Sequence, residues 1–127
     1  MAHFHIDYSA NLEEIIDMAG LCEAIRLCAA SIETFPLAGI RVRAVRVDHV
    51  AMADGDQKHG FIDLSVRLRE GRSDEVKQQA MATIFEALKA YTAPAMANHS
   101  IAISAEMRDI DAALSPKYGT IRDHMKG

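Results

Sequence analysis

The sequence contains no tryptophan and few other aromatic residues, so its core must be built mainly from aliphatic side chains and methionine. Aromatic residues make up 6% of the 127 residues, whereas 50% are hydrophobic and 25% are charged. A disordered chain is poorer in apolar residues than this. The length fits one domain, because domains usually contain about 100–200 residues. We therefore expect residues 1–127 to form a single globular domain.

The chain also lacks a basic excess and a membrane-spanning run. Its 18 acidic residues outnumber its 14 basic ones, giving a net charge of -4, whereas nucleic-acid binders normally show a basic excess or stripe. No apolar run approaches the roughly 18 residues that cross a bilayer, and the first residues lack the pattern of a secretory signal. We expect no nucleic-acid partner, no membrane association and a cytoplasmic location.

Only two cysteines are present, and no cysteine and histidine spacing typical of a zinc site occurs. Cys22 and Cys28 are separated by about 9 Å along a helix axis, which is too far for a disulfide. Thiols with apolar helical neighbours are usually small core residues. His3 and His5 share one strand face, as two metal ligands can, but the sequence places no third ligand. We expect no metal site, and two solvated or interface histidines.

Three common catalytic motifs are missing as well. The chain has no glycine-rich phosphate loop, no G-x-S-x-G elbow and no H-E-x-x-H sequence. Nucleotide hydrolysis, serine hydrolysis and zinc proteolysis therefore lose their usual support. Of the reaction classes considered, acid–base chemistry on an anionic substrate remains.

What is present is a regular alternation of apolar and polar residues that predicts two βαβ units in tandem. The pattern predicts strands over 3–9, 40–50, 61–69 and 100–107, and helices over 18–32 and from 74 to an end or kink at Pro94. Asp17 and Ser73 are the expected helix N-caps. A phase slip at Ala44-Val45 predicts a β-bulge in the second strand.

This element order predicts an α+β fold. Right-handed crossovers place both helices on one face of a four-stranded mixed sheet. The opposite face would carry Asp63, Ser65 and Arg67 and meet either water or further copies of the chain. We favour self-association, because a small two-layer chain buries little surface by itself.

Three arginines are candidate binding residues. Arg41 and Arg43 share a strand face, and Arg72 lies between a glycine and a helix N-cap. A guanidinium donates two parallel hydrogen bonds to a carboxylate, and the free amides of a helix start add a positive field. A dianionic small molecule is thus the expected ligand. The competing interpretation is that all three form ordinary surface ion pairs.

Several short segments, in a fixed order, span nearly the whole chain. They are His3-Phe4, Phe35-Pro36, Gly39-Ile40-Arg41-x-Arg43, Met52-Ala53-Asp54-Gly55, Gly71-Arg72-Ser73 and Gln78-Gln79. Their order and spacing resemble the 5-carboxymethyl-2-hydroxymuconate isomerase family of the tautomerase superfamily, which has the fold of macrophage migration inhibitory factor. The resemblance implies a homotrimer that moves a double bond by proton transfer in a dicarboxylated dienol from aromatic-acid catabolism, without metal or organic cofactor.

The resemblance also implies site residues. Arg41 and Arg72 match positions that hold substrate carboxylates or the carbonyl end of the substrate. Arg43 matches the pattern too, but alternatively serves the trimer interface. The family's general base is an amino-terminal proline exposed by removal of the initiator methionine, and Ala2 occupies that place here. A primary amine there has an ordinary pKa of about 7.7–8.0, and arginine charge lowers this pKa, so it can accept a proton.

Two alternatives remain open at this point. A non-catalytic trimer that binds acidic small molecules is expected if Met1 stays in place, because the amine then lies one residue from the family's position. The other alternative is a decarboxylase, dehalogenase or hydratase of the same superfamily, which would use the same amino-terminal amine and carboxylate-binding arginines.

Overall fold

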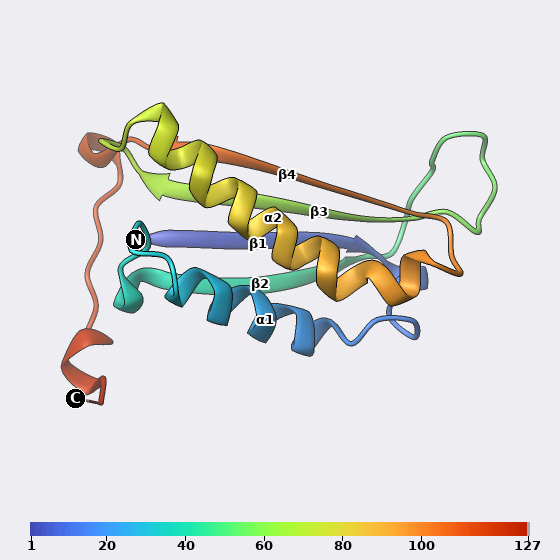
Figure 1. Cartoon of the computed structure of the whole chain (residues 1–127), viewed down its shortest axis with the longest axis horizontal. Coiled ribbons are helices and arrows are strands. Elements are labelled where there is room, and N and C mark those ends of the chain that lie inside the picture. The colour runs from blue at the N-terminus through green and yellow to red at the C-terminus, as the bar shows by residue number, and fades with distance from the viewer. Residues whose placement is uncertain (127) are drawn as a thin grey trace.

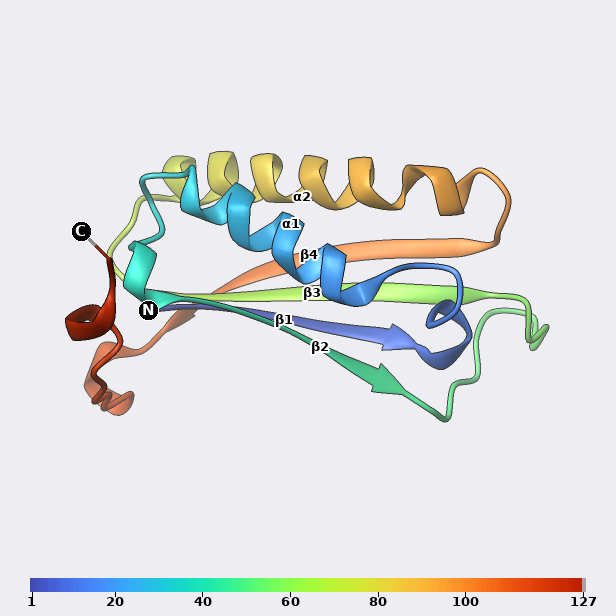
Figure 2. The same ribbon diagram turned by 90° about the horizontal axis from the view of Figure 1, so that it is seen from below.

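The computed structural model describes residues 1–126 and shows a sheet with both helices on one face (Figures 1 and 2). Its main elements are β1 (Ala2–Ser9), α1 (Met18–Ala30), β2 (Ile40–Val47), β3 (Gly60–Arg69), α2 (Asp74–Met96) and β4 (Ile101–Ile110). The strand order is β2-β1-β3-β4. The strand pairs β1–β2 and β3–β4 are parallel and β1–β3 is antiparallel. The predicted α+β fold of two βαβ units is confirmed.

The two helix starts are those that the sequence predicts. The Asp17 carboxylate accepts a hydrogen bond of 3.1 Å from the Gly20 amide, and the Ser73 hydroxyl accepts one of 3.3 Å from the Val76 amide. Each cap satisfies an amide that the first helical turn leaves free. The helix α2 continues through Pro94 and ends at Met96.

The predicted bulge in the second strand is wrong. Each residue of β2 pairs with one residue of β1, from Ile40 opposite Ala2 to Val47 opposite Ser9. Val45 breaks the apolar alternation because it lies on the sheet face that the helices leave uncovered, where it is 46% exposed. An apolar residue on an exposed face of an edge strand changes the sequence pattern without changing the pairing.

The core lies between the helices and the sheet. Alternate residues of β1 and β3, together with one face of each helix, are fully buried: Phe4, Ile6, Ile62, Leu64, Val66, Leu68, Leu21, Ile25, Ile84 and Leu88. Burying one such side chain stabilises the fold by about 1.5–3 kcal/mol. This packing fixes β1 in the middle of the sheet and holds Ala2, at its start, completely buried.

Both cysteines are free thiols that pack against the edge of this core, as predicted. Burial raises the pKa of Cys22 and of Cys28. Across residues 1–126, no helix combines the length and apolar character needed to cross a bilayer.

The sheet face opposite the helices is left uncovered (Figure 2) and is only partly apolar, as the sequence predicts, since it carries Asp63 and Ser104 as well as the exposed Val45. Ser104 donates a hydrogen bond of 2.8 Å to Asp63 across β3 and β4. At the far end of the sheet from the amino terminus, the His59 ring lies 2.8 Å from Asp54 and 2.6 Å from Ser100. These contacts fasten the connection between β2 and β3 to the start of β4.

Candidate active site

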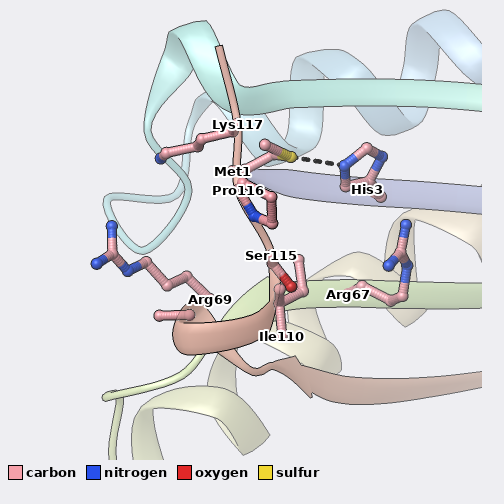
Figure 3. Close-up of a pocket in the computed structure, with 9 residues that line it drawn as sticks. Met1, His3, Arg67, Arg69, Ile110, Ser115, Pro116 and Lys117 are labelled. Carbon is pink, nitrogen blue, oxygen red and sulfur yellow. Dashed lines mark hydrogen bonds between the residues drawn. The ribbon is translucent and has the colours of Figure 1, made fainter.

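The amino terminus lies at one end of the sheet, and the C-terminal segment passes beside it (Figures 1 and 2). We call residues 111–126 the C-terminal segment. After β4 this segment forms a short 3-10 helix, Ala112–Leu114, and then runs past Met1 through Ser115 and Lys117 (Figure 3). Two cavities open here, and Met1 and Lys117 line both of them.

The first cavity, which we call the Arg69 cavity, has a volume of about 290 Å³. Residues from β1, β3, β4 and the C-terminal segment line it: Met1, His3, Arg67, Arg69, Ile110, Ala112, Ser115, Pro116 and Lys117. Figure 3 shows Arg69 and Lys117 extending to one side of the segment, with Arg67 and His3 on the other. Three cationic side chains therefore surround a space beside the amino terminus.

The second cavity, the Arg41 cavity, has a volume of about 420 Å³. The turn before β2 and the C-terminal segment line it: Met1, Pro36, Ala38, Gly39, Arg41, Lys117, Tyr118, Gly119, Ile121 and Arg122. An Arg41 guanidinium nitrogen donates a 3.0 Å hydrogen bond to the Gly39 carbonyl. This bond leaves the other guanidinium donors free for a ligand.

Gly39 allows the amino terminus to lie this close to the turn. A Cβ atom on Gly39 would lie 2.9 Å from the Met1 Cα and 3.2 Å from its nitrogen, but 3.5 Å from the Ala2 nitrogen. The first distance is shorter than real side-chain contacts, whereas the last is ordinary van der Waals contact. Any side chain at position 39 would therefore push Met1 out of place.

The surroundings lower the pKa of the amino-terminal amine below its usual 8.0. Burial is the largest cause, followed by the positive charges of Lys117, Arg72, Arg41 and Arg69. Both effects disfavour the ammonium form. A larger fraction of the amine is thus neutral near pH 7 than in a free peptide, and a neutral amine can accept a proton.

The three predicted arginines occupy different positions. Arg41 lines a cavity beside Met1. Arg72 donates to the backbone carbonyls of Arg69 and Thr34 at 2.9 and 3.2 Å and lines neither cavity, although its charge acts on the amine. Arg43 lies on the uncovered sheet face, away from both cavities. The structure thus brings Arg41 to the terminus, keeps Arg72 within electrostatic range and separates Arg43.

The ion-pair interpretation of these arginines is wrong for the described part of the chain. Within residues 1–126, no carboxylate lies within 4.0 Å of the guanidinium groups of Arg41, Arg43 or Arg72. Arg69 and Lys117 have no such partner there either. In a chain of net charge -4, a cluster of cations without carboxylates indicates a site for an anion.

The two histidines of β1 contact Arg43 instead of forming a metal site. Arg43 donates to the Nδ1 atom of His5 at 3.0 Å and lies 3.2 Å from that of His3. Because a guanidinium only donates, the remaining hydrogen of a neutral His3 is on Nε2, which faces the Met1 sulfur at 2.7 Å. Burial, Arg67 and Arg43 lower the pKa of His3. Among the described residues, no group of three or more potential ligands gathers for a metal.

Arg69 and Lys117 are among the cavity-lining residues that sequence reasoning missed. Arg67 and Arg69 alternate along β3, and the antiparallel register places Leu68, between them, opposite Ala2. Predicting that pairing would have revealed Arg69. Lys117 lies in a segment without periodicity, so no sequence signal points to it.

Comparisons with known proteins find similar sequences and similar structures over nearly the whole chain. Residues 2–125 match the family model of 5-carboxymethyl-2-hydroxymuconate isomerase. The chain is 34% identical over 121 residues to the 5-carboxymethyl-2-hydroxymuconate Delta-isomerase of Escherichia coli, covering 95% of this chain and 96% of that enzyme. A crystal structure of a 5-carboxymethyl-2-hydroxymuconate delta-isomerase superposes with a TM-score of 0.92 at 29% identity, covering 100% of this chain and 95% of that one.

The fold is shared more widely. The wild-type symmetric trimer of a fused 4-OT protein has a TM-score of 0.56 at 16% identity, with 89% of this chain and 91% of that chain covered. At this identity the match shows the fold alone.

Replacing Gly39 with alanine tests how closely the terminus packs. We expect Gly39→Ala to lower the free energy of unfolding by about 1–3 kcal/mol in protein that retains Met1, the usual cost of overpacking. Protein lacking Met1 should lose less, because the Ala2 nitrogen lies at an ordinary contact distance. Urea denaturation of both forms measures this difference.

Gly119→Ala is the matched control, since nothing lies within 4 Å of a Cβ atom there. Equal losses for Gly39→Ala with and without Met1 would contradict the packing described here.

Proposed function

Because the chain belongs to the 5-carboxymethyl-2-hydroxymuconate isomerase family and is an isomerase, we propose that it moves a double bond in a dienol of the 5-carboxymethyl-2-hydroxymuconate type. Such a dienol carries the two carboxylates of muconate and a third on its carboxymethyl group. Such a reaction belongs to aromatic-acid catabolism. The observation that carries the proposal is the lowered pKa of the Met1 amine, one residue before Ala2, among cations that have no carboxylate within 4.0 Å in residues 1–126. The non-catalytic alternative is not favoured, because the identity to the E. coli enzyme extends over 95% of this chain.

In the proposed mechanism the proton carrier is the amine of Ala2, after Met1 has been removed. The neutral nitrogen takes a proton from one end of the conjugated system and returns it to a carbon further along. The double bond shifts, and the amine is neutral again at the end, so no proton is gained or lost overall. One group within hydrogen-bond reach of both positions is sufficient for this transfer.

The proposed role of Arg41 is to bind one carboxylate of the substrate. Its side chain lines the cavity beside the terminus, and a planar guanidinium pairs with a carboxylate through two parallel hydrogen bonds. We assign Arg72 to the same end of the substrate. Two of its donors hold the carbonyls of Arg69 and Thr34, which leaves others for the ligand and adds positive potential. Arg43, on the uncovered face, is assigned to the subunit interface.

Removing either substrate-binding arginine should weaken binding of a dicarboxylate. We expect Arg41→Ala and Arg72→Ala each to reduce the affinity for adipate, an unreactive dicarboxylate, by more than about tenfold, or about 1.4 kcal/mol. Isothermal titration calorimetry measures the affinity. Unchanged affinity in both variants would refute the assignment.

Arg46→Ala is the matched control for this experiment. Arg46 lies on the same strand as Arg41 but pairs with Asp48 at 2.9 Å, near the other end of β2. Its removal should leave adipate affinity at the wild-type value.

Substituting proline at position 2 should raise the rate of isomerisation in protein freed of Met1. The proline ring stops rotation about the N–Cα bond, so the nitrogen that moves the proton has fewer orientations available than the amine of alanine. Stopped-flow absorbance of a 2-hydroxymuconate-type dienol follows the reaction, after mass spectrometry has established that Met1 is absent.

Ala2→Gly is the control, because it keeps a primary amine and should give no gain. If Ala2→Pro and the wild type react at the same rate, the amine is not the base.

We further propose a homotrimer in which the uncovered sheet faces meet. That face carries His5, Arg43 and Asp63 and is not covered by any element of the described chain. The fused 4-OT protein, which shares the fold, is a symmetric trimer. Sedimentation equilibrium should give about three times the chain mass of 13.9 kDa. A mass equal to one chain would overturn this proposal.

A further inference from the structure

We propose that Lys117 and Arg69 bind the second carboxylate of the substrate, so that the C-terminal segment is part of the active site. This inference rests on the proposed function, in which Arg41 and Arg72 hold the first carboxylate. It adds two binding residues and a role for a segment whose sequence shows no pattern.

The position of Lys117 between the two cavities is the first argument. Apart from Met1, Lys117 is the residue that lines both the Arg41 cavity and the Arg69 cavity. The Met1 side chain also lies where the two cavities adjoin, with its sulfur turned toward His3 (Figure 3). Loss of Met1 would join the cavities into one site. A dicarboxylate in that site would have one end at Arg41 and the other at Arg69, with Lys117 within reach.

The second argument is charge. Lys117 and Arg69 extend to the same side of the C-terminal segment (Figure 3), although like charges repel. Within residues 1–126, neither side chain has a carboxylate within 4.0 Å to offset this repulsion. A substrate carboxylate between them would supply the missing negative charge. Because a lysine ammonium is a compact charge on a flexible stem, Lys117 can follow the carboxylate as the substrate enters.

The third argument is the effect of Lys117 on the amine. The charged or titratable groups that line the two cavities with Met1 come from β1, β2, β3 and the C-terminal segment: His3, Arg41, Arg67, Arg69, Lys117 and Arg122. Arg72, before α2, adds its charge from outside the cavities. Among the charges that lower the pKa of the Met1 amine, that of Lys117 has the largest effect, and we expect the same of the Ala2 amine one residue away. Lys117 thus favours the neutral amine as well as the bound substrate, and its loss should raise the pKa of the amine.

The decisive variants are Lys117→Met and Arg69→Met, which keep much of the side-chain length and remove the charge. In Met1-free protein, we expect each to weaken adipate binding about tenfold in calorimetry and to change hexanoate binding, which needs only one carboxylate site, by less than about twofold. Lys117→Arg should restore adipate affinity. Lys126→Met, in the same segment but outside both cavities, should bind adipate like the wild type.

A pH profile separates binding from a merely structural role. Protonation of the amine stops proton abstraction, so activity falls as the pH drops through the pKa of the amine. In Lys117→Met this fall should occur at a higher pH than in the wild type, and KM should rise more than kcat falls.

The outcomes distinguish the two proposals. If the wild type isomerises the dienol but Lys117→Met keeps wild-type KM, adipate affinity and pH profile, Lys117 is not a substrate-binding residue and the inference is wrong. If Lys117→Met loses adipate affinity while the wild type shows no isomerisation, the anion site stands and the proposed reaction fails. A wild type that neither binds adipate nor isomerises the dienol overturns both.

Discussion

A terminal amine held among positive charges, with no carboxylate of residues 1–126 within 4.0 Å, is the interaction on which the site depends. In water such an amine would be mostly protonated, and a nearby acid would keep it so. Here burial and the charges of Lys117, Arg72, Arg41 and Arg69 act in the same direction and lower its pKa. The same cations attract an anionic substrate. One arrangement therefore supports both steps of the proposed reaction, binding an acid and receiving its proton.

The fold produces this arrangement through strand pairing. The strand β1 is central, and its first residue, Ala2, lies between Ile40 at the start of β2 and Leu68 near the end of β3. Residues adjacent to these two positions are Arg41 and Arg69. The C-terminal segment then returns to the same end of the sheet and brings Lys117. Residues distant in the sequence thus meet because the two βαβ units are antiparallel to each other.

Elements with one buried face were predictable from the sequence. The alternation around Phe4 and Leu64 follows from burial under the helices. The Asp17 cap was predictable because its carboxylate binds an amide only three residues further along the chain. The edge strand β2 was predicted less well, since Val45 is apolar on an exposed face and suggested a bulge that does not exist. Arg41 was found from its position and from family resemblance. Lys117 was not, because its role depends on where an irregular segment ends in space.

The state of the amino terminus decides whether these groups act together. With Met1 present, the Arg41 and Arg69 cavities are separate and the amine lies against Gly39. In the proposed active form, without Met1, the amine belongs to Ala2 and one site replaces the two cavities. The most direct test is a nitrogen-15 NMR titration of the terminal amine in Met1-free protein. Because burial and the surrounding cations lower the pKa of the Met1 amine, the account predicts that the Ala2 amine, one residue away, also has a pKa below the ordinary value of about 7.7–8.0; a pKa at or above that value would contradict it.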